Sequence, residues 1–91
     1  MSSIDPQIRD QAYQFFSQEA IEFLQTIEEG LMELRTDRSI PVVHNLMRAA
    51  HSIKGGAASV GLPGIQQIAH RMEDVFRALY RQEKEIDRDV E

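Results

Sequence analysis

The chain of 91 residues contains no cysteine and no tryptophan, and it has only three prolines. Without cysteine it can form no disulfide, carry out no thiol catalysis and build no metal site with thiolate ligands. Positive charge is scarce, because ten lysines and arginines stand against fifteen acidic residues, for a formal net charge of -5. This balance argues against a nucleic-acid partner, since contacts with phosphate backbones need a basic surface.

Long apolar runs are also missing. No stretch approaches the roughly 18 consecutive apolar residues that a membrane-spanning helix needs, and the N-terminus has no signal-peptide pattern. We therefore expect a cytoplasmic protein without a membrane partner. A chain of this length makes one domain at most, over residues 1–91.

What the sequence does contain is helical periodicity, with no convincing alternation of apolar and polar residues. Asp5 before Pro6 and the polar Ser39 are typical helix starts, and Gly61 is a typical helix end. Three amphipathic helices joined by short loops predict an all-α fold, an antiparallel bundle. The predicted helices cover about 5–35, 39–59 and 63–82.

Each predicted helix carries an apolar stripe that should face the core. On the first helix, Phe15, Ile21 and Met32 lie off this stripe, so a further helix or a second chain is expected to cover them. The stripes consist of Ala12, Phe16, Ala20, Phe23, Ile27, Leu31 and Leu34; of Val43, Leu46, Ala50, Ile53 and Ala57; and of Ile65, Ile68, Met72, Val75, Phe76 and Leu79.

The most informative segment is residues 50–56, where His51, Lys54 and Gly55 share one face of the second helix. At roughly 100° per residue, the core stripe centres about 120° from His51, so this histidine should be accessible. The stripe that contains it consists of His44, Met47, His51, Lys54, Gly55 and Ala58.

An accessible histidine beside a cation suits the transfer of a phosphoryl group. The neutral imidazole is the nucleophile, and a carboxylate should hold its other ring N–H. Lys54 offers a positive charge for phosphoryl oxygens, because such transfer depends mainly on positioning and electrostatics. Glu73 on the flank of the third helix is the best candidate for the carboxylate, and His70 lies one turn before it. Small residues leave room for a partner's active site: Gly55, Gly56, Ala57 and Ala58.

Residues 48–57 (RAAHSIKGGA) resemble the signature of histidine phosphotransfer (HPt) domains. They are most similar to the N-terminal phosphotransfer domain of CheA-type chemotaxis histidine kinases. Residues 15–20 resemble the first helix of that family, residues 61–62 resemble its turn after the histidine helix, and residues 70–75 resemble its H-x-[LM]-E segment.

The resemblance implies a phosphoryl carrier of a two-component phosphorelay, one that is not an enzyme by itself. His51 would accept a phosphoryl group at Nε2 from ATP held by a separate kinase domain, in cis or in trans. It would then donate the group to an aspartate of a response-regulator receiver domain. Glu73 would hold Nδ1–H, Lys54 would stabilise the phosphoryl oxygens, and His70 would support the site. The domain would bring no cofactor or metal of its own, and any Mg²⁺ would belong to its partners.

The family's bundle has a fourth helix after the third. Residues 87–91 correspond to the first turn of such a helix, so we expect a fragment of a larger multidomain kinase whose fourth helix is truncated. We also expect the fragment to cover its exposed groove by self-association.

Two other functions compete with this interpretation. One is a helical interaction or dimerisation module without chemistry, in which Glu73 only pairs with Arg77 on the helix surface. The other is a metal site of His44, His51, His70 and Glu73. It is disfavoured because His44 and His51 are two turns apart, roughly 10 Å along the axis. His44, Met47 and Ala58 are instead expected to lie near the partner surface.

Overall fold

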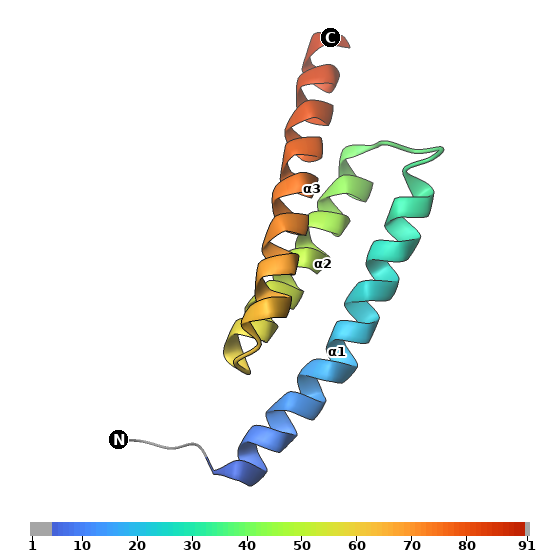
Figure 1. The fold of residues 1–91 in the computed structure, drawn as a ribbon. Helices are drawn as coiled ribbons and strands as arrows, with labels where there is room; N and C mark the ends of the chain where they lie inside the picture. Colours follow the sequence, from blue (N-terminus) through green and yellow to red (C-terminus); the bar gives the residue numbers. More distant parts are fainter. Residues whose placement is uncertain (1–4, 91) are drawn as a thin grey trace.

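The computed structural model describes residues 5–90, and for residues 87–90 it describes only the backbone. It contains three helices, α1 (Pro6–Glu33), α2 (Ile40–Ser59) and α3 (Pro63–Val90), and no strand in the described range. Consecutive helices run antiparallel, and α2 lies between α1 and α3 (Figure 1). Because α2 packs against both neighbours while the described residues of α1 and α3 make no backbone contact, the bundle is open on one side. The predicted all-α class is confirmed.

The helices begin where the sequence predicts, but their caps differ in detail. Asp5 caps α1 through its side chain, which accepts a hydrogen bond of 2.8 Å from the backbone N–H of Gln7. Ser39 occupies the cap position of α2, yet its hydroxyl makes no capping hydrogen bond. Instead its backbone N–H donates to Asp37 Oδ1 at 3.0 Å. The start of α2 is therefore fixed by the preceding loop and by Pro41 in its first turn.

The turn between α2 and α3 sets how these two helices face each other. Gly61 adopts a φ of 74°, in the left-handed region that side chains disfavour. The N–H of Leu62 donates to the carbonyl of Ala57 at 2.9 Å, which satisfies one of the last carbonyls of α2. Because the reversal is so short, α3 returns directly alongside α2.

The third helix is longer than predicted. It continues to Val90 instead of ending near residue 82, so residues 87–90 extend α3 and do not begin a fourth helix. Neither glycine nor proline occurs after Gly64 to interrupt it, and the residues of this segment are mostly good helix formers. Glu83 also pairs with Arg38 of the α1–α2 loop at 3.2 Å, which holds this part of α3 against the bundle. Glu91 lies outside the described residues.

The core is built mainly from α2, as its stripe predicts. All five predicted stripe residues of α2 are buried, together with Val42 and Ala49. Phe16 and Ile27 of α1 pack against one side of this helix, and Ala69 and Phe76 of α3 pack against the other. The alanines of α2 let both neighbours approach closely.

The apolar stripe of α3 was assigned to the core too broadly. Ile65, Ile68 and Val75 are exposed, whereas Met72 and Leu79 are partly buried. The line of α3 that faces α2 is instead formed by buried residues at spacings of four and three: Ala69, Glu73 and Phe76. On α1 the expected core residues Ala12 and Leu31 are also exposed. The off-stripe residues of α1 are exposed as expected, and self-association over these surfaces stays a prediction.

Two glycines mark the closest approach of α1 and α2. A Cβ on Gly56 would lie 2.6 Å from Cδ1 of Phe16, and a Cβ on Gly30 would lie 2.7 Å from Cδ2 of Leu46. By contrast, a Cβ on Gly55 would meet nothing within 4 Å. Gly56 therefore serves helix packing, and Gly55 faces open space.

This difference predicts opposite effects for two neighbouring substitutions. Gly55→Ala should raise the free energy of unfolding by up to about 1 kcal/mol, because alanine favours the helix and meets no obstacle. Gly56→Ala gains the same propensity but overpacks against Phe16, at a typical cost of about 1–3 kcal/mol. Chemical denaturation should therefore place Gly56→Ala below Gly55→Ala in stability, and equal stability of the two variants would contradict the packing role.

Candidate functional site

His51 projects from α2 toward α3 and is accessible, as the helical geometry predicts. Its side chain is 65% exposed, and its Nδ1 lies 2.8 Å from Oε2 of Glu73. Only one edge of the ring is therefore engaged by the protein. The ring combines a fixed orientation with an open approach.

Glu73 anchors this arrangement from α3, and it is buried, not placed on the helix flank as predicted. Its side chain is only 3% exposed, and no other charged residue is buried in the described range. Lys54 Nζ forms an ion pair with Oε1 at 2.6 Å, and this buried oxygen accepts no hydrogen bond of regular geometry from the described residues. Oε2 accepts from His51 and also from Arg77 Nη2 at 2.9 Å. Three donors thus hold one buried carboxylate.

The charge state of Glu73 follows from these contacts. Burial alone raises the pKa of a carboxyl group, but here the hydrogen bonds and charges of Lys54 and His51 outweigh it. The pKa of Glu73 is consequently lowered from the ordinary value of 4.5. At neutral pH the carboxylate is ionised and can only accept hydrogen bonds. In the neutral ring of His51 the proton must therefore be on Nδ1, which leaves the lone pair on Nε2.

His70 and Asp74 form the outer part of the cluster. His70 Nε2 lies 3.5 Å from Asp74 Oδ2, and Asp74 Oδ1 lies 3.4 Å from Arg77 Nη1. His70 therefore reaches Glu73 only through Asp74 and Arg77, and its support of the site stays a prediction. Arg77, whose spacing predicts helix-surface pairs with Glu73 and Asp74, makes both contacts and donates to the same Glu73 oxygen as His51.

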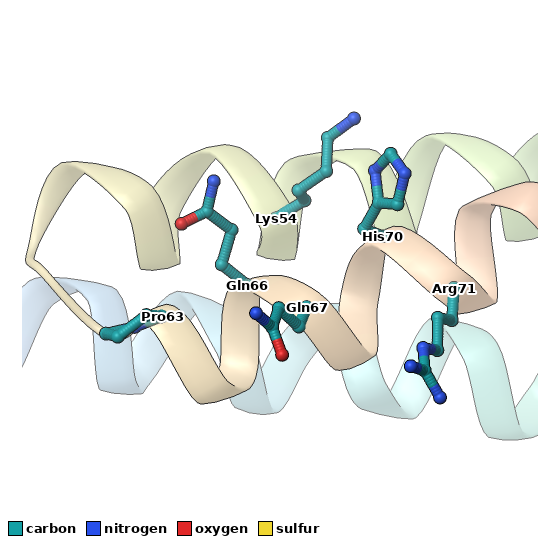
Figure 2. Close-up of a pocket in the computed structure, with 6 residues that line it drawn as sticks. All are labelled: Lys54, Pro63, Gln66, Gln67, His70 and Arg71. Carbon is teal, nitrogen blue, oxygen red and sulfur yellow. The ribbon is translucent and has the colours of Figure 1, made fainter.

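A hollow of about 360 Å³ lies beside this cluster, between the adjoining ends of α2 and α3. Its lining includes Lys54, Gln66, His70 and Arg71. In Figure 2, Lys54 projects from α2 and His70 from α3 toward the same side of the helix pair. The surface next to His51 is therefore concave and lined by basic and amide groups.

The small residues after His51 do not all contribute open surface. Gly55 and Ala58 are exposed, as an approach by a partner requires. Ala57 is fully buried and Gly56 packs against Phe16, so these two serve the core. This corrects the expectation that all four small residues leave room for a partner.

Two more residues of the predicted stripe lie nearer the start of α2. The ring of His44 is half-buried and packs against the ring of Tyr80 at a tilt of 42°, with ring centroids 5.7 Å apart. Met47 packs against the core and is also half-buried.

The part of the chain that the structure describes holds no group of three or more histidine, cysteine or acidic residues arranged to bind a metal ion. None of its helices is long and apolar enough to cross a membrane.

A comparison with protein families shows to which family the chain belongs. The family model described as the Hpt domain matches residues 11–91, and the chain belongs to this family. The match includes every residue of the site described above. It confirms the resemblance to HPt domains and supports a phosphotransfer carrier role.

Curated relatives point to the same group. The chain is 37% identical over 79 residues to the chemotaxis protein CheA of Klebsiella aerogenes, which is 86% of this chain and 12% of that protein. It is 35% identical over 75 residues to CheA of Bacillus subtilis, covering 81% of this chain and 11% of the relative. A gliding motility regulatory protein of Myxococcus xanthus is 35% identical over 63 residues, which is 69% of this chain and 8% of that protein. No solved structure matches the chain.

The contact between His51 and Glu73 predicts a specific tautomer. In the folded protein at neutral or mildly alkaline pH, nitrogen NMR of the His51 ring should show the proton on Nδ1. Glu73→Ala removes the acceptor, so the form protonated at Nε2 should gain population. Glu73→Gln should keep the Nδ1–H form, because its amide oxygen still accepts. A spectrum of His51 that is the same in all three proteins would contradict the orienting role.

The lowered pKa of Glu73 predicts how stability depends on pH. Folding weakens proton binding by Glu73, so its stabilising effect is present above about pH 4.5 and is lost as the pH falls below that value toward the folded pKa. Glu73→Gln cannot take up this proton. Its free energy of unfolding should fall less steeply below pH 4.5 than that of the wild type, while the exposed Glu28→Gln keeps the wild-type slope. Parallel curves for Glu73→Gln and wild type would refute the assignment.

Proposed function

We propose that this domain carries a phosphoryl group on Nε2 of His51 within a two-component phosphorelay. It receives the group from ATP held by a kinase catalytic domain and delivers it to an aspartate of a receiver domain. The observation that carries the proposal is the hydrogen bond between Nδ1 of an exposed histidine and a buried, ionised carboxylate. The chain matches only about a tenth of the length of its curated relatives, so the kinase domain is assigned to a partner, in cis or in trans.

In the first transfer the Nε2 lone pair attacks the γ-phosphorus of ATP. The N–P bond forms, the bond from phosphorus to the bridging oxygen breaks, and ADP leaves with the electron pair. The ring keeps its proton on Nδ1 and so gains positive charge, which the Glu73 carboxylate stabilises at 2.8 Å. Glu73 thereby favours the transition state over the starting neutral ring.

In the second transfer a carboxylate oxygen of the receiver aspartate attacks the same phosphorus. A P–O bond forms, the N–P bond breaks, and the electron pair returns to Nε2. A ring that still carries the Nδ1 proton is the better leaving group, because it departs as neutral imidazole. One hydrogen bond therefore serves both directions of transfer.

Lys54 and the open surface contribute to both steps. The ammonium of Lys54 lies beside the carboxylate that holds His51, so it can stabilise negative charge on the phosphoryl oxygens. Gly55 and Ala58 leave the approach from solvent open, and the hollow beside Lys54 offers concave surface to a partner's active site. His70 supports the site through Asp74.

Labelling with radioactive ATP tests this function. Kinase cores of the Klebsiella and Bacillus CheA relatives should transfer the γ-phosphoryl group to the wild-type domain as an acid-labile, base-stable adduct. His51→Gln should remain unlabelled, whereas His44→Gln, two turns away on the same helix, should still be labelled. Glu73→Ala should slow transfer about ten- to hundredfold, comparable to the loss when the partner orienting a metal-binding histidine is removed. Equal labelling of His51→Gln, or no labelling of the wild type by either core, would overturn the proposal and favour an interaction module.

A further inference from the structure

Arg77 lies one helical turn after Glu73 on α3 and is the third donor to its carboxylate. Nη2 donates to Oε2 at 2.9 Å, while Nη1 lies 3.4 Å from Asp74 Oδ1. Exposed pairs of this spacing stabilise a helix by only a few tenths of a kcal/mol. The pair of Arg77 with Glu73 differs because Glu73 is buried. Its Oε2 accepts hydrogen bonds from both Arg77 and the ring of His51.

The proposed transfer places two demands on Lys54. In the structure its Nζ lies 2.6 Å from Glu73 Oε1, and it is the main group that favours the ionised form of this carboxylate. A phosphoryl group on His51 would bring about two negative charges close to Glu73. The more Lys54 interacts with these oxygens, the less it offsets the charge of Glu73. A like charge nearby also favours protonation of a carboxylate.

Arg77 is placed to offset the charge of Glu73 when Lys54 interacts with the phosphoryl oxygens. It approaches Glu73 from α3, whereas Lys54 and His51 both approach from α2. Its guanidinium stays charged at every pH relevant to proteins, and its two nitrogens reach two different carboxylates, which fixes its direction. A carboxylate oxygen can accept two hydrogen bonds, so Arg77 does not displace His51 from Oε2.

We propose that Arg77 is a positioning residue that holds Oε2 of Glu73 directed at Nδ1 of His51 while Lys54 turns to the phosphoryl group. Arg77 itself touches neither the phosphoryl group nor the reacting nitrogen. The anchoring of Glu73 follows from geometry alone, and its use during transfer rests on the proposed function.

The test imitates the withdrawal of Lys54 with Lys54→Ala in the full chain. Carbon NMR of the Glu73 carboxyl group then reports its titration with and without Arg77→Gln. With Lys54 present, Arg77→Gln should shift the pKa of Glu73 little. In the Lys54→Ala background it should raise the pKa by about 1 to 3 units, the usual effect of losing a nearby opposite charge. The other titratable groups of the cluster are unchanged in all four proteins: His51, which contacts Glu73, and Asp74 and His70 in its outer part.

Transfer rates give a second, independent arm. Arg77→Gln should slow labelling by a CheA-type kinase core about tenfold or more, with Arg77→Lys intermediate. Arg81→Gln, at an exposed arginine one turn further along α3, should stay within about twofold of wild type. If Arg77→Gln does not fold, Arg77→Lys replaces it in the Lys54→Ala background. It should raise the pKa of Glu73 by less than the shift of about 1 to 3 units expected for Arg77→Gln, because its charge remains.

The two arms separate the possible failures. A purely structural role would lower thermal stability but leave both the Glu73 titration and the labelling rate of the folded protein unchanged, and that result overturns the proposal. If the wild type is not labelled at all, the phosphoryl-carrier function fails. The NMR titration needs no kinase and still decides whether Arg77 holds Glu73.

Discussion

The buried carboxylate of Glu73 is the interaction on which the site depends. Moving a carboxylate out of water costs several kcal/mol unless partners compensate, and here three donors do so. Two of them come from α2 and one from α3. The carboxylate therefore joins the helices in one register as well as orienting the histidine. The short turn at Gly61 makes this register possible, because it brings the end of α2 directly onto the start of α3.

Much of this could be predicted from the sequence, because it depended on local spacing. The apolar stripe of α2 is regular, and its five predicted members are all buried. The same periodicity placed His51 away from the core, and its side chain is indeed exposed. The sequence also predicts the pairing of His51 with Glu73. This prediction rests on the resemblance to a family and on the need for a carboxylate at the second ring nitrogen. No spacing within one helix can show which residue of another helix faces it.

The burial of Glu73 and the extent of α3 could not be predicted for physical reasons. Hydrophobic periodicity predicts that the most apolar line of α3 is its core face, but several members of this line are exposed. The line that meets α2 contains a charged residue, which hydrophobic patterning assigns to the surface. A better signal was available in the spacing of Ala69, Glu73 and Phe76, where a small and a large apolar residue bracket the acid. A charged, polar segment predicts a helix boundary near residue 82, but its residues favour helix, Arg38 pairs with Glu83, and α3 continues to Val90.

Glu73, the acceptor, is buried, whereas the ring of His51 is exposed. This contrast suits a carrier that holds a group only briefly. A carrier must not stabilise the phosphorylated form too strongly, since the group has to leave again. On the proposed function, the carboxylate at Nδ1 stabilises the positive charge that forms on attack, and the Nδ1 proton that it holds in place lets the ring depart as neutral imidazole. Donors aimed directly at the phosphoryl group would stabilise the bound group itself. The structure keeps most of its ionic contacts on the Glu73 side of His51, and Lys54 is the group placed to act on both sides. On the proposed function, this division assigns the orientation of His51 to the bundle.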